Sequence, residues 1–169
     1  MKRNYFDWPA NALLWVAAAM AVLLVLAMML EVFSRYVLNA PTLWAFDISY
    51  MLNGAMFILG CAYASKTDAH VRIDFLASRL KPATQRWING GFYLFLFAPI
   101  LAALTWTAGK RTWHAFVTAE VEHVSPWAPL IWPFYSALAI GLAALTLQVV
   151  VEAYRYLTDQ KQPSGGLPE

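Results

Sequence analysis

The chain contains 169 residues, of which 60% are apolar and only 13% are charged, and its mean hydropathy is +0.51. A water-soluble domain of this size cannot bury so much apolar surface, so the composition predicts a membrane protein and excludes intrinsic disorder. The net charge is +2 and no basic stripe is present, which excludes nucleic acid as an expected partner.

Four long apolar runs predict four transmembrane helices, because about 20 mostly apolar residues cross the hydrocarbon core of a bilayer. None of the runs contains Asp, Glu, Lys or Arg. The first run is too long for a secretory signal peptide and lacks a small-x-small cleavage site, so we expect it to be retained. The expected spans cover residues 12–30, 48–65, 88–108 and 130–151.

Lys and Arg are distributed unequally among the segments that flank these spans. The N-terminus, the segment 66–87 and the C-terminal tail hold nine of them, whereas the segments 31–47 and 109–129 hold three. Since positive residues favour the cytoplasmic side, both termini are expected in the cytoplasm. The predicted fold class is therefore all-α, with a four-helix membrane domain at 1–158 and a disordered tail at 159–169.

The first outer segment carries a group of polar and aromatic residues. Glu31 and Arg35 are four apart and can pair on one helix face. Asn39 is typical of a helix C-terminus, Trp44 suits the membrane interface, and Asp47 can compensate the dipole of the second helix. Two interpretations stay open: the group anchors and caps helices, or it contacts another protein at membrane depth.

The inner segment alternates polar and apolar residues around His70, Arg72 and Asp74. From Asp74 to Lys81 the apolar residues have helical spacing, which predicts a short interfacial helix whose basic residues contact anionic lipid. His70 has no second metal ligand nearby in the sequence, so we interpret it as a hydrogen-bonding loop residue.

The second outer segment combines acidic, imidazole and aromatic side chains. Glu120, Glu122 and His123 are a weak indication of a metal site, and we favour a solvated outer face that meets a periplasmic partner. Trp127 and Trp132, together with three prolines, predict a rigid aromatic entry to the last span.

The spans lack the groups that chemistry or ion transport requires. Intramembrane ionisable residues mark ion pathways, and none lies within these spans. His70, His114 and His123 all lie in loops, which argues against a haem site, and Cys61 suits a small apolar core position. We expect no enzyme activity, no cofactor and no metal, but a helical membrane subunit that works through partners.

From the first span to about Arg155, the chain resembles the small membrane subunit of tripartite ATP-independent periplasmic (TRAP) transporters. The resemblance depends on the order and spacing of several short motifs. The matching positions are Arg35-Tyr36, Asn39, Pro41, Trp44 and Asp47 after the first span, His70-Val71-Arg72-Ile73-Asp74 in the inner segment, and Ser125, Trp127, Pro129, Trp132 and Pro133 before the last span.

Two positions depart from the family pattern. Phe46 stands where the family often has the first of two adjacent acids, so only the second, Asp47, is present. The basic residue often found after the tryptophan-proline of the last span is absent at 134–136.

The resemblance implies a bacterial inner-membrane complex. In it, a large many-helix permease carries the substrate and sodium sites, and a periplasmic binding protein delivers an organic acid. The small subunit would scaffold the large one. We expect the outer helix junction to be ordered by Arg35, Asn39, Trp44 and Asp47, and the cytoplasmic one by His70, Arg72 and Asp74. Ser125, Trp127 and Trp132 are expected to be partner-interface or structural residues.

Three alternatives remain. A self-sufficient homodimeric four-helix exporter needs a carboxylate within the first span, and Glu31 stands at the end of that span. A membrane-anchor subunit of a redox complex would be expected to carry intramembrane histidines. A structural or assembly protein without a transport role would differ mainly in its partner.

Overall fold

The computed structural model describes residues 8–66, 87–88 and 90–158. Within them the chain forms helices that are long and apolar enough to cross a membrane four times, as the sequence predicts. The elements are α1 (Trp8–Tyr36), α2 (Ala45–Lys66), the π-helical segment η2 (Tyr93–Phe97), which continues into α5 (Ala98–Val117), and α6 (Trp132–Leu157).

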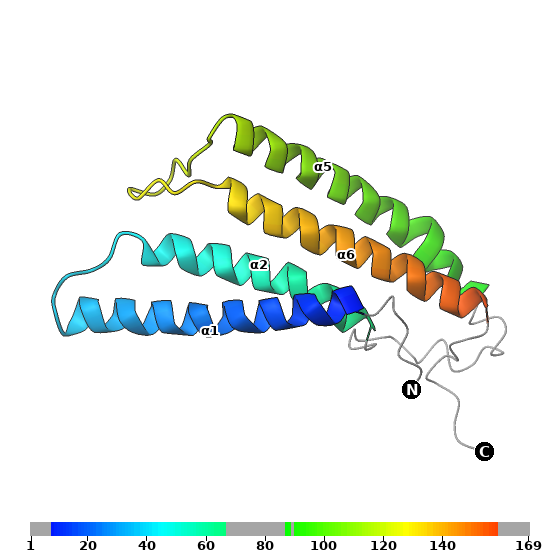
Figure 1. Cartoon of the computed structure of the whole chain (residues 1–169), viewed down its shortest axis with the longest axis horizontal. Coiled ribbons are helices and arrows are strands. Elements are labelled where there is room, and N and C mark those ends of the chain that lie inside the picture. Colours follow the sequence, from blue (N-terminus) through cyan, green and yellow to red (C-terminus); the bar gives the residue numbers. More distant parts are fainter. Residues whose placement is uncertain (1–7, 67–86, 89, 159–169) are drawn as a thin grey trace, which may run out of the picture.

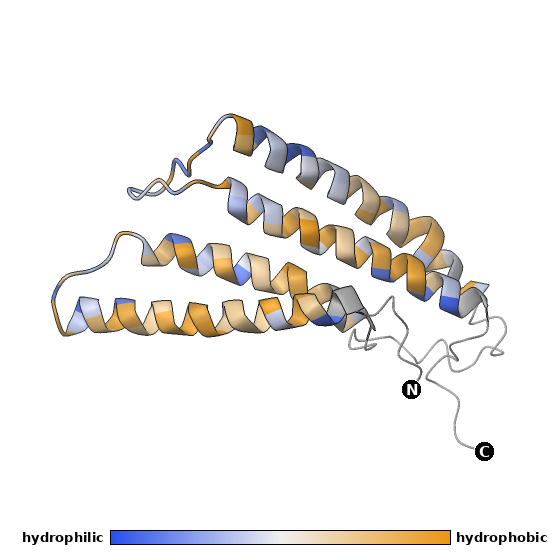
Figure 2. Ribbon diagram, viewed as in Figure 1, coloured by the Kyte–Doolittle hydropathy of each residue, from blue (hydrophilic) through white to orange (hydrophobic). Residues whose placement is uncertain are grey.

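The helices form an open row in the order α1, α2, α6, α5 (Figure 1). Each helix packs mainly on its neighbours in the row, and α1 contacts α6 only marginally. Many large apolar side chains, such as Trp15 and Phe95, are therefore exposed, as expected for helices that face lipid or a partner. Figure 2 shows hydrophobic positions along the helices and hydrophilic ones gathered toward their ends.

Two glycines allow α2 and α6 to approach closely at the centre of the row. A Cβ added to Gly141 would lie 2.9 Å from Ile58 Cγ2 and 3.0 Å from the backbone carbonyl carbon of Ile58. A Cβ added to Gly54 would lie 2.9 Å from Cε2 of Phe134. Small residues at such contacts let membrane helices pack backbone against side chain, so α2 and α6 form a tight seam at these two glycines.

The ends of the helices differ from the expected spans. The first and third helices extend beyond residues 30 and 108, because polar residues at a helix end can reach the interface. The last helix begins two residues later than expected, since Leu130 instead forms an isolated antiparallel bridge with Val121.

The π-helical segment precedes a proline in the third helix. Pro99 has no backbone N–H, so the carbonyl four residues before it loses its usual donor. The N–H of Ala98 donates to the carbonyl of Tyr93, five residues back, which is the hydrogen bond of a π-helix. The interfacial helix expected after Asp74 and the expected tail lie outside the described residues, and the cytoplasmic position of the termini stays a prediction.

Candidate functional site

The connections 37–44 and 118–131 lie at the same end of the row, which we call the loop end (Figure 1). Glu31, buried in the last turns of α1, joins the first connection to the helix. Its Oε1 accepts hydrogen bonds from Nε and Nη2 of Arg35 at 2.9 and 2.5 Å. Its Oε2 accepts the backbone N–H of Thr42 at 3.0 Å and also the Thr42 hydroxyl. One carboxylate therefore fixes the path from α1 toward α2.

Asn39 and Trp44 stand at the two ends of this turn. Asn39 has a φ of 51°, the left-handed conformation that commonly follows a helix C-terminus. The N–H of Ala40 donates to the carbonyl of Ser34 at 3.0 Å, which satisfies a carbonyl of the last turn. The carbonyl of Trp44 accepts the N–H of Ile48 at 3.1 Å and so begins α2.

Asp47 links α2 to the connection between α5 and α6. Its side chain is buried, with 1% of its surface exposed, and its Oδ2 accepts the hydroxyl of Ser125. The Ser125 Oγ in turn accepts the backbone N–H of Trp127 at 3.2 Å. Three of the expected site residues, Asp47 and the distant pair Ser125 and Trp127, therefore form one hydrogen-bonded chain.

A second link lies one turn further along α2. The hydroxyl of Tyr50 donates to Glu122 Oε2 at 2.9 Å, and the N–H of Val124 donates to Glu122 Oε1 at 3.2 Å. These hydrogen bonds, that of Tyr50 above all, hold the pKa of the Glu122 carboxyl below its ordinary value. The ring of Tyr50 also packs edge-on against Phe134 of α6, with centroids 5.9 Å apart.

A third link joins α5 to the same connection. Nη2 of Arg111 donates to Glu120 Oε1 at 2.6 Å, and the guanidinium lies 5.2 Å from the centre of the Tyr135 ring. Glu120 and Glu122 are thus partly exposed and hydrogen-bonded within the chain, whereas His123 is exposed. The described residues contain no group of three or more His, Cys, Asp or Glu that could hold a metal ion.

The remaining expected site residues divide into two groups. Trp132 begins α6 and packs edge-on against Phe116 of α5, with ring centroids 5.4 Å apart. His70, Arg72 and Asp74 lie outside the described residues.

The sequence interpretation missed a buried polar cluster at the opposite end of α6. Gln148 and Glu152 have 1% and 2% of their surface exposed. Glu152 Oε1 accepts hydrogen bonds from Gln148 Nε2 at 3.2 Å and Arg155 Nη1 at 3.0 Å. Their spacing of four and three residues, which places them on one helix face, was the available signal.

The loop end also presents a mixed surface to its surroundings. A cavity of about 440 Å³ lies between the start of α2 and the connection 118–131, with Asp47, Tyr50 and Glu122 among its lining residues. Phe46 and Val124, which also line it, are exposed. The polar groups are hydrogen-bonded to one another, so the arrangement suits fastening and surface contact more than a reaction.

Comparison with known proteins gives two matches. Residues 24–159 match the family model described as the DctQ component of tripartite ATP-independent periplasmic transporters. A 50-residue segment is 36% identical to the sialic acid TRAP transporter small permease protein SiaQ of Vibrio cholerae. That segment makes up 30% of this chain and 29% of the relative, so the match covers less than a third of either protein.

Proposed function

From the premise that the chain belongs to the DctQ component family of tripartite ATP-independent periplasmic transporters, as the match over most of its length shows, we propose that it scaffolds a large permease subunit. In this proposal the chain is non-catalytic. The large subunit carries the substrate and sodium sites, and a periplasmic binding protein delivers an organic acid to the loop end.

The observation that carries the proposal is an open row of helices fastened across its loop end. Asp47 accepts a hydrogen bond from Ser125 and Tyr50 donates one to Glu122, which joins α2 to the connection between α5 and α6; Arg111 joins α5 to the same connection. At the centre Gly141 brings α6 against α2. A scaffold needs a fixed shape and a broad surface for its partner, and a single layer of helices supplies both.

The positions of the charged side chains favour a supporting role over a transporting one. Glu31 and Asp47 lie near the loop end, and Glu152 lies near the other end of its helix. Each accepts hydrogen bonds from neighbouring residues. Substrate sites for charged solutes require polar groups near the middle of the membrane, which supports placing those sites in the large subunit.

The class of solute is proposed from the family resemblance and from the name of one relative. Sialic acid carries a carboxylate, and the relative that matches here is named as the small permease of a sialic acid transporter. An organic acid is therefore the class we propose.

Affinity purification of the full chain from its native membranes tests the proposal. With a C-terminal tag and a mild detergent, we expect one large many-helix membrane protein to co-purify in near-equal amount. Arg35→Ala removes two hydrogen bonds from Glu31 and should lower this yield, and Arg35→Lys, which keeps the charge, should lower it less.

Two results would contradict the proposal. A homodimer without a partner would favour a self-sufficient exporter, in which Glu31 is the carboxylate to test. A haem absorbance spectrum in the purified material would favour an anchor subunit of a redox complex.

A further inference from the structure

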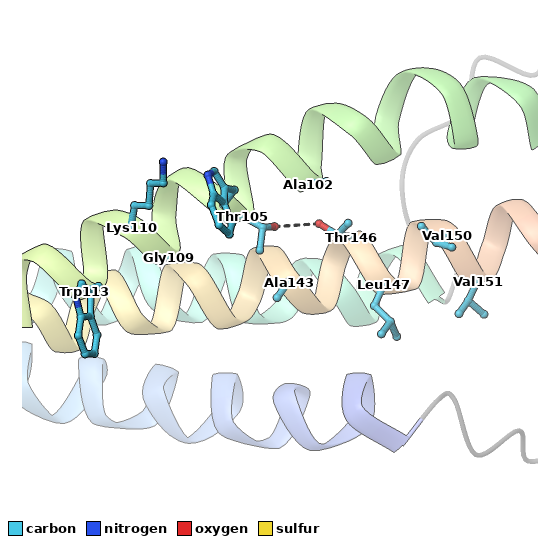
Figure 3. Close-up of a pocket in the computed structure, with 11 residues that line it drawn as sticks. Ala102, Thr105, Gly109, Lys110, Trp113, Ala143, Thr146, Leu147, Val150 and Val151 are labelled. Carbon is cyan, nitrogen blue, oxygen red and sulfur yellow. Dashed lines mark hydrogen bonds between the residues drawn. The ribbon is translucent and has the colours of Figure 1, made fainter.

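An open groove of about 980 Å³ runs between α5 and α6 (Figure 3). Ala102, Gly109 and Ala143 keep it wide, because their side chains are small or absent. The two hydroxyl side chains that line it, Thr105 and Thr146, lie 3.1 Å apart, and each also donates to the carbonyl four residues before it. With its hydroxyls already bonded, the groove offers an apolar surface.

The depth of the groove follows from the charge-free run that precedes Lys110. Residues 87–109 contain no charged side chain, and at about 1.5 Å per residue the part from 90 to 109 alone spans about 30 Å, the thickness of the hydrocarbon core. Lys110 therefore stands where hydrocarbon gives way to lipid headgroups. Trp113 follows one turn later, at a depth that tryptophan prefers.

Lys110 is a cation without a counter-ion at the rim of this groove. Its Nζ lies 5.1 Å from the centre of the Trp106 ring, and Figure 3 shows the Lys110 side chain extending from α5. It makes no ion pair with any residue in the described ranges, whereas the adjacent Arg111 is paired with Glu120. An exposed ammonium group at this depth attracts an anion.

We propose that the groove binds one anionic phospholipid of the bilayer, with an acyl chain between α5 and α6 and the phosphate against Lys110. A phospholipid supplies both parts of the site at once, an apolar chain for the groove and a negative phosphate for Lys110, whereas an apolar transmembrane helix would fill the groove alone. The inference goes beyond the proposed function, because it does not depend on which protein the chain assembles with.

Native mass spectrometry tests the proposal on the full chain purified together with its co-purifying subunits. The protein is titrated with phosphatidylglycerol or with phosphatidylcholine of the same acyl chains, and bound lipids are counted. We expect phosphatidylglycerol to be retained preferentially. Lys110→Gln should reduce that preference about fivefold, from the usual contribution of one basic residue near a membrane, and Lys110→Arg should preserve it.

The acyl-chain part of the site has its own matched variants. Gly109→Leu places a large side chain in the groove and should abolish retention of the lipid. Gly60→Leu is the control, because a Cβ added at either glycine meets no atom within 4 Å and Gly60 lies on α2, outside the groove. Ala143→Leu fills the groove from α6 and provides a second test if Gly109→Leu misfolds.

Two results would overturn the proposal. The first is equal retention of the two lipids by the unmodified chain, or retention that neither Lys110→Gln nor a groove-filling variant changes. The second is a groove-filling variant that releases a protein partner and leaves lipid retention unchanged, which would make the groove a helix-docking surface. Neither result depends on the identity of the transported solute.

Discussion

The two ends of the helix row carry buried charge in different ways. At the loop end, Asp47 and Glu122 accept hydrogen bonds that join elements 78 and 72 residues apart in the sequence. At the other end, Glu152 accepts hydrogen bonds from Gln148 and Arg155 within one helix. A buried charge needs a partner in either place, but only a partner from another element fixes how helices sit against each other. The hydrogen bonds of Asp47 and Glu122 therefore help to fix the arrangement of the row at its loop end.

The largest loss of stability is expected between the two ends, where Gly141 of α6 packs against α2. Gly141→Leu should force α2 and α6 apart, because even a Cβ would lie 3.0 Å from the backbone of Ile58. We expect a loss of about 3 kcal/mol or more in the free energy of unfolding in detergent micelles. The control Gly60→Leu should cost far less, and equal losses would contradict a tight seam.

The next prediction concerns the buried link at the loop end. Ser125→Ala leaves the carboxylate of Asp47 without its hydroxyl donor and should cost about 2 kcal/mol. It should also expose the connection 118–131 to protease. Asp47→Asn can still accept the Ser125 hydroxyl and should cost less. If Ser125→Ala is as stable as the unmodified chain, the link does not fasten the loop end.

At the opposite end, a change to the buried carboxylate should leave the loop end intact. Glu152→Gln keeps a hydrogen-bonding side chain but removes the ion pair with Arg155, for a cost of about 1 kcal/mol. Limited proteolysis should show the connection 118–131 unchanged. Cleavage there in Glu152→Gln would show that the two ends are coupled more strongly than we infer.

The smallest expected effect is a pH dependence of the stability, which arises from Glu122 at the loop end. The folded chain holds the pKa of Glu122 below its ordinary value, so this residue stabilises the fold above that ordinary value. The contribution is lost as the pH falls through the lowered pKa. Between about pH 6 and about pH 3 the unmodified chain should lose more stability than Tyr50→Phe, which lacks the hydrogen bond. Parallel pH profiles of the two proteins would be inconsistent with this role of Tyr50.

Local spacing made some of this structure predictable. The apolar runs predict the four helices, and the interval of four residues predicts the pairing of Glu31 with Arg35. The order of the helices in the row and the contact of Asp47 with Ser125 join distant segments, and local spacing along the sequence does not show which distant segments meet. The bridge between Val121 and Leu130, which delays the start of α6, is non-local in the same way.

If the row of helices is a fixed scaffold, the distance between α2 and α5 stays constant, and measuring that distance tests the scaffold most directly. Phe46→Cys and Val117→Cys place spin labels at two exposed positions, one on α2 and one on α5. The native Cys61 is replaced by serine so that only these two positions are labelled. The labelled chain is purified together with its partner subunit. Pulsed electron resonance should give one narrow distance distribution, unchanged by sodium or by the periplasmic binding protein. A distribution that splits or shifts with either addition would contradict a fixed scaffold.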